Sequence, residues 1–151
     1  MAYFGTMPRL TSLNILLRSA RHDDGLRNFL IVNPQLVGFA LAGAFYDLSL
    51  LPPSALPNLR AIRATAEQIQ YLLPGRRVSK VEICKSSKFK FMVDGLRALS
   101  RSAAPIVELT LHVHHDDVHL CEILDAVVEA VSRLERIWLS FHAEVRTILD
   151  F

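Results

Sequence analysis

The feature that most constrains the fold is an apolar pattern that occurs twice between Met92 and Leu139, in the same register. In each copy, four apolar residues spaced i, i+4, i+7 and i+11 form one face of a helix, and a motif apolar-x-x-apolar-x-apolar follows. The first copy consists of Met92, Leu96, Leu99, Ala103, Ile106, Leu109 and Leu111. The second consists of Leu120, Leu124, Val127, Val131, Leu134, Ile137 and Leu139, each 28 residues further on. The pattern predicts a helix–strand unit that is used repeatedly.

The strand half of this unit occurs six times along the chain. The six motifs begin at residues 10, 36, 59, 78, 106 and 134. Their start-to-start spacings are 26, 23, 19, 28 and 28 residues, and four of these five lie within the period of about 20–29 residues found in leucine-rich repeats. The third motif is the weakest, because Ala64 occupies its last apolar position.

Proline residues and helix signals separate the motifs. Prolines at positions 8, 34, 57 and 105 stand one or two residues before a motif, where a helix must end and an extended strand begin. Between the motifs, short helices are expected at 24–31 and at 65–73, the second with a capping box formed by Thr65 and Gln68. Residues 46–56 predict a turn or 3₁₀ connection, 85–90 a basic loop, and 143–151 the beginning of another helix.

These elements predict one α/β domain over residues 1–151, an irregular leucine-rich-repeat solenoid with parallel strands on one face and helices on the other. Neither a lone helix nor a lone short strand can bury its apolar side, whereas stacked units share a continuous core. The three apolar residues of each motif are expected to point toward the helices, and the x positions onto a concave sheet face.

From about Leu36 to Phe141 the chain resembles the leucine-rich-repeat region of fungal F-box proteins. The phrases LPNLR at 56–60 and LRALSRS at 96–102, the latter leading into Ala104-Pro105-Ile106, carry this resemblance. The resemblance implies a substrate-recognition part of an F-box-type ubiquitin ligase. Two features depart from the family: the asparagine that typical repeats place three residues after the last motif leucine is absent, and no F-box segment is found. A ubiquitin-ligase adaptor is therefore expected as a partner only if an F-box lies outside this chain, which is then a fragment of a longer protein.

Composition and charge narrow the function classes. The chain has 151 residues, of which 51% are hydrophobic and 21% charged, which fits one folded domain with a sizeable core. A net charge of +2 does not predict a nucleic-acid partner. The two cysteines, Cys84 and Cys121, do not make a disulfide framework. No secretory signal and no apolar run of about 20 residues is found, so we predict no membrane partner and a cytoplasmic or nuclear location.

Three groups of polar residues could bind a ligand or take part in catalysis. The run at 112–121, HVHHDDVHLC, contains the ligand types that zinc prefers, and a small metal-dependent or hydrolytic enzyme using this cluster is the alternative function. Because no second cluster of ligands is present, the favoured interpretation is a loop in which Asp116 or Asp117 caps the next helix, with no metal, no cofactor and no catalytic residues. His22-Asp23-Asp24 likewise predicts a helix cap. The basic residues Arg76, Arg77, Lys80, Lys85, Lys88 and Lys90, interleaved with Phe89 and Phe91, predict a solvated edge.

The predicted concave face is the stronger functional candidate. Its first half carries uncharged and mostly small residues, Ser12, Asn14, Gly38, Ala40 and Ala61. Its second half is charged and ends in the single tryptophan, and arginine and tryptophan dominate binding hot spots. The residues predicted to bind a protein partner are Arg63, Lys80, Glu82, Glu108, Thr110, His112, Arg136, Trp138 and Ser140. The alternative for Trp138 is that it packs against a C-terminal segment containing Val145, Ile148 and Leu149, since a terminal repeat needs a cap.

Overall fold

The computed structural model describes residues 6–17, 24–43, 46–84, 89–114 and 119–142. Within these ranges the chain forms six strands, four α-helices and one 3₁₀ helix. In chain order they are β1 (Ser12–Leu17), α1 (Gly25–Val32), β2 (Gly38–Gly43), β3 (Ala61–Thr65), α2 (Ala66–Leu72), β4 (Lys80–Cys84), α3 (Phe89–Arg97), η1 (Ala98–Arg101), β5 (Glu108–His114), α4 (Leu120–Ala130) and β6 (Arg136–His142).

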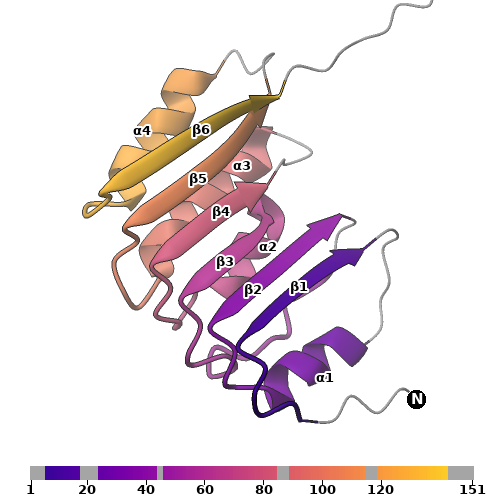
Figure 1. Cartoon of the computed structure of the whole chain (residues 1–151). Coiled ribbons are helices and arrows are strands. Elements are labelled where there is room, and N and C mark those ends of the chain that lie inside the picture. Colours follow the sequence, from indigo (N-terminus) through magenta and orange to yellow (C-terminus); the bar gives the residue numbers. More distant parts are fainter. Residues whose placement is uncertain (1–5, 18–23, 44–45, 85–88, 115–118, 143–151) are drawn as a thin grey trace, which may run out of the picture.

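The strands form one parallel sheet whose order, β1-β2-β3-β4-β5-β6, is the order of the sequence. The sheet is open, so that β1 and β6 are its edges. Figure 1 shows α2, α3 and α4 behind the sheet and α1 at the end next to β1. The predicted α/β class, the parallel strands and the placement of helices on one face of the sheet are therefore confirmed at this level.

Each of the six strands begins two residues after the start of its predicted motif, because the same backbone arrangement precedes it. The carbonyl oxygen one residue into a motif accepts hydrogen bonds from two successive N–H groups of the next motif. Thr11 O accepts from Val37 N at 2.7 Å and Gly38 N at 3.0 Å, and Val107 O accepts from Glu135 N and Arg136 N at 3.0 Å each. The intermediate acceptors are Val37, Arg60 and Ser79. This ladder fixes the register of the sheet without any asparagine side chain.

The core lies between the sheet and the helices. In β2, β3, β4 and β5 the motif residues are buried, and most are below 3% exposed. The corresponding residues of the edge strands are less covered, since β6 has a neighbouring strand on one side only. Ile137, for example, is 40% exposed although it aligns with the buried Leu109. A strand's position in the sheet, and not its motif, decides how completely the motif is buried.

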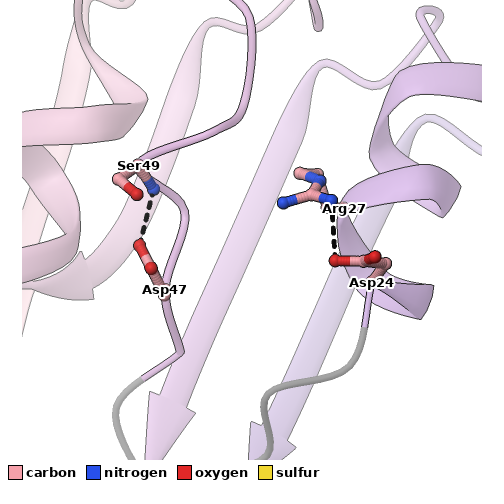
Figure 2. Close-up of polar contacts among 4 residues, drawn as sticks. All are labelled: Asp24, Arg27, Asp47 and Ser49. Carbon is pink, nitrogen blue, oxygen red and sulfur yellow. Dashed lines mark hydrogen bonds and ion pairs between the residues drawn. The ribbon is translucent and has the colours of Figure 1, made fainter.

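Two short helices begin with different local contacts. The capping box predicted at the start of α2 is present, and the Gln68 Oε1 atom accepts a hydrogen bond from Thr65 N at 3.1 Å. Asp24 occupies the N-cap position of α1, but its carboxylate pairs with Arg27 at 2.6 Å and makes no capping hydrogen bond. Figure 2 shows this pair beside a second local contact, in which Asp47 accepts a hydrogen bond from Ser49 N at 2.8 Å. Both aspartates therefore have local structural roles.

The structure corrects the predicted extents of two helices. The expected basic loop at 85–90 is shorter, because Phe89 and Lys90 begin α3; residues 85–88 lie outside the described ranges. The α-helical hydrogen bonding ends at Arg97 and a 3₁₀ turn follows, so Ala103 is exposed and not part of the helix face. In α4 the buried residues are Ile123, Ala126 and Val127. The predicted face residue Leu124 is 36% exposed, because α4 packs against α3 and lacks a helix on its other side within the described residues.

The predicted solvated edge at Arg76 and Arg77 is wrong for Arg76, which is only 1% exposed. Its guanidinium donates hydrogen bonds to five backbone carbonyl oxygens. They belong to Pro52 at 2.7 Å, Ala55 at 2.8 Å, Tyr71 at 3.0 Å, Leu72 at 3.1 Å and Pro74 at 3.5 Å. Burial lowers the pKa of Arg76 to about 10, which leaves the side chain charged at neutral pH. Arg76 thus joins the 46–56 segment to the end of α2.

Asn33 also joins separate segments through side-chain hydrogen bonds to the backbone, and replacing it should destabilise the fold. Asn33 is fully buried; its Oδ1 accepts from Met7 N at 2.7 Å and its Nδ2 donates to Phe29 O at 2.9 Å. We expect Asn33→Ala to lower the free energy of unfolding by about 1–3 kcal/mol, because the buried carbonyl of Phe29 and the partly buried N–H of Met7 lose their partner. Urea unfolding followed by circular dichroism measures this. Asn58→Ala, at an exposed hydrogen bond to Pro34 O, is the matched control and should change it by less than about 0.5 kcal/mol.

Candidate functional site

The candidate site is the sheet face opposite the helices, which we call the open face. Side chains alternate along each strand, so residues two apart lie on the same face. The open face carries Ser12, Asn14, Gly38, Ala40, Ala61, Arg63, Lys80, Glu82, Cys84, Glu108, Thr110, His112, Arg136, Trp138 and Ser140. All nine residues predicted to bind a partner are on this face.

The open face is hollowed. A shallow hollow of about 320 Å³ extends from β1 to β6 and draws lining residues from all six strands. Six of the nine predicted residues line it: Arg63, Lys80, Glu82, Glu108, Thr110 and Trp138. The small residues Ser12, Gly38, Ala40 and Ala61 form its other half and leave the space open. Ser140 pairs with His112 in the β5–β6 register but does not line the hollow.

Glu82 is the centre of the first ion-pair cluster on the open face. Its Oε1 atom lies 3.1 Å from Arg63 Nε and 2.8 Å from His112 Nε2. Arg63 is on β3, Glu82 on β4 and His112 on β5, so the cluster crosses three neighbouring strands. Cross-strand pairs of opposite charge stabilise a sheet, and this one also fixes the three side chains relative to one another.

Glu108 is the centre of the second cluster, one strand further along. Its Oε1 atom lies 3.1 Å from Lys80 Nζ and also pairs with Arg136 NH2. Lys80, Glu108 and Arg136 are directly aligned in the register of β4, β5 and β6. The two clusters therefore repeat one design, a glutamate between two basic side chains.

The arginine and lysine side chains of the clusters are more exposed than the glutamates, whereas His112 is only 20% exposed. Arg63 is 50% exposed and Glu82 31%. The difference is larger in the second cluster, where Lys80 and Arg136 are each 57% exposed and Glu108 only 15%. An approaching molecule therefore meets N–H donors first and carboxylates beneath them.

Trp138 completes the charged half of the open face. It is 46% exposed, and the Arg136 guanidinium carbon lies 5.7 Å from its ring centroid, within the range of a cation–π contact. A half-exposed tryptophan beside an arginine is the combination found in binding hot spots. The residues of the alternative, Val145, Ile148 and Leu149, lie outside the described ranges, so a packing role for Trp138 stays a separate prediction.

Cys84 is a residue of this face that the sequence analysis did not select. It follows Glu82 by two positions and therefore lies on the same side of β4. Hydrogen bonding to Cys84 and the nearby carboxylate of Glu82 raise the pKa of Arg63 above its usual value. The strand alternation would have identified it, had it been continued to the end of β4. The other cysteine, Cys121, is exposed on α4.

The histidine-rich run at 112–121 is divided between two elements. The strand β5 continues to His114, so the run begins in a strand, and His112 is on the open face as predicted. His119 occupies the N-cap position of α4, where its ring stacks on Phe89 at 4.4 Å and its Nδ1 lies 2.8 Å from Glu122 Oε1. Asp116 and Asp117 lie outside the described ranges. Among the residues that the structure describes, no three His, Cys, Asp or Glu side chains are grouped so that they could hold a metal ion.

No known protein family, curated protein or solved structure matches this chain. In the described ranges, every helix is too short or too polar to cross a membrane.

Proposed function

We propose that this chain is a protein-interaction module that binds its partner on the charged half of the open face. The observation that carries the proposal is the hollow across all six strands, lined on one side by small residues and on the other by Trp138 and four members of the two ion-pair clusters, Arg63, Lys80, Glu82 and Glu108. A shallow surface of this kind suits an extended or flat partner better than a small molecule, because a small-molecule site encloses most of its ligand.

The packing of the sheet supports the same proposal. Strands fixed by a repeated backbone ladder hold their side chains in set positions, and a rigid scaffold reduces the entropy lost on binding. We further propose that the parallel strands with helices on one side are an irregular leucine-rich-repeat solenoid. By its resemblance to fungal F-box proteins, the module would then recognise substrates for a ubiquitin ligase.

The experiment that tests the proposal is a pull-down from a lysate of the source organism with two variants. Arg136→Ala/Trp138→Ala removes the exposed pair of the open face. Lys90→Ala/Arg97→Ala removes two exposed cations from α3, on the helical side, and is the matched control. We expect the first variant to lose the partner and the control to keep it, because hot-spot residues commonly contribute about 2 kcal/mol or more each.

Circular dichroism and urea unfolding must show that both variants are folded. The proposal is contradicted if both folded variants retain the same partners as the wild type, and Trp138 would then be assigned a structural role. Loss of the partner from both variants would place the binding surface elsewhere.

A further inference from the structure

We propose that the open face binds an acidic segment of its partner, with the partner's carboxylates contacting Arg63, Lys80 and Arg136. This inference rests on the proposed function and specifies the chemistry of the partner. Its basis is the order of the charges above the sheet: Arg63, Lys80 and Arg136 are at least 50% exposed, whereas the two glutamates are less exposed, at 31% and 15%.

The basic groups keep hydrogen-bonding capacity beyond the ion pairs described. A guanidinium has five N–H donors and an ammonium three. In the clusters Arg63 uses Nε toward Glu82 and also hydrogen-bonds to Cys84, and Arg136 uses Nη2 toward Glu108. The remaining N–H groups can donate hydrogen bonds to carboxylate oxygens of the partner.

Net charge favours the same partner. Apart from His112, the two clusters contain three positive and two negative side chains, so a positive charge remains. A basic segment would meet this charge before it could reach the glutamates. The small residues at Gly38, Ala40 and Ala61 leave room for a backbone to lie on the sheet.

The dimensions fit a short extended peptide. Arg63 on β3 is in register with Trp138, so it is separated from Arg136 on β6 by three inter-strand spacings, about 14 Å, and by two residues along the strand, about 7 Å, which together make about 16 Å. An extended chain advances about 3.3 Å per residue, so about five residues that run obliquely across the strands reach all three basic groups. Trp138, at the β6 end, offers an aromatic surface beside them.

Fluorescence of Trp138 tests the inference directly, because it is the chain's only tryptophan and lines the hollow. The probe is a capped eight-residue peptide of alternating Asp and Ser, titrated to millimolar concentration. Ser/Asn and Ser/Lys peptides of the same length are the comparisons. We expect only the acidic peptide to change the emission, and its binding to weaken between about 0.15 M and about 1 M salt, where the Debye length falls from about 8 to about 3 Å.

Two substitutions should act in opposite directions. Lys80→Gln should weaken binding of the acidic peptide about threefold, and Arg63→Gln/Lys80→Gln about tenfold, in line with exposed charge pairs. Glu108→Gln should tighten it about threefold, because it removes a repelling carboxylate; a merely structural role for Glu108 would instead weaken binding. Lys90→Gln/Arg97→Gln, on the helical side, should leave it unchanged.

The inference is overturned if the acidic peptide leaves the emission unchanged, if the neutral peptide binds equally, or if the basic peptide or an oligonucleotide of equal charge binds more tightly. The pull-down separates this failure from failure of the proposed function. If a captured partner requires Arg136 and Trp138 and its capture does not weaken with salt, that result would support the interaction module and contradict the acidic segment. If no captured partner depends on the open face and the acidic peptide does not bind, both the interaction module and the acidic segment are rejected.

Discussion

Replacing Arg76 by methionine is expected to lower the free energy of unfolding by about 3–5 kcal/mol, the largest effect of any substitution considered for this protein. Methionine fills a similar volume but donates no hydrogen bond. Five carbonyl oxygens that now accept hydrogen bonds from the guanidinium would lose this donor, two of them at buried and three at partly buried positions. The end of α2 would also lose a positive charge near its last carbonyls, which a helix dipole favours.

Urea unfolding at neutral pH, followed by circular dichroism, measures this loss. Arg77→Met is the matched control: Arg77 is exposed, so the free energy should change by less than about 0.5 kcal/mol. Arg76→Lys should fall between the two, because an ammonium offers three donors for five acceptors. An Arg76→Met protein as stable as the wild type would show that the 46–56 segment does not depend on this side chain.

The pH dependence of this site has a defined sign. Burial lowers the pKa of Arg76 to about 10 in the folded chain, below its ordinary value in the unfolded chain, so the unfolded state binds more protons between the two values. The contribution of Arg76 to stability therefore rises with pH through that window and is constant below it. The difference between the wild type and Arg76→Met should accordingly not change from pH 6 to 8.

Gly95→Ala is expected to destabilise the protein by about 2 kcal/mol, although alanine in a helix is normally about 1 kcal/mol better than glycine. Gly95 lies in α3 where it crosses the start of α2. A Cβ atom there would lie 2.8 Å from both the Cβ and the carbonyl oxygen of Ala66, and 2.9 Å from its Cα. Two of these three atoms belong to the backbone, so the helices themselves would have to move apart.

The same unfolding measurement tests this prediction. Lys90→Ala, at an exposed position of the same helix, is the control and should change the free energy by less than about 0.5 kcal/mol. Ala66→Gly added to Gly95→Ala should recover only part of the loss, because it removes the Cβ contact and leaves the carbonyl contact in place. A stabilised Gly95→Ala protein would mean that α2 and α3 are further apart than described.

Much of the sheet could be predicted because strand motifs are local. Three apolar residues with the spacing of Val78, Val81 and Ile83 indicate both a strand and the face that it buries, and all six strands begin where these motifs place them. Helix faces were harder to predict. The alignment of the two copies assigns Leu124 to the buried face, but α4 buries Ile123 instead, since its orientation depends on which neighbours it packs against.

The candidate site was likewise predicted in part. Strand alternation was enough to place Arg63, Lys80, Glu82 and the other selected residues on one face. It did not reveal the pairing of each glutamate with two basic groups, nor which partner is the more exposed, because these depend on side-chain conformations across neighbouring strands. For the histidine run, composition left a cluster of ligands open as the alternative, and the structure places His112 in β5 and His119 at the start of α4.

The sequence by itself determined the order of the strands, their inward and outward faces and the gathering of charge at one end of the open face, since periodicity and repeat spacing are properties of the chain. Only the tertiary structure decided that Arg76 is buried and that Gly95 is a point of close contact. These two residues are defined by segments distant in sequence: Arg76 donates to the carbonyl of Pro52, and Gly95 meets Ala66. From its residue type alone, a charged side chain is predicted to be exposed. Arg76 can be buried because the fold brings five carbonyl oxygens around its guanidinium.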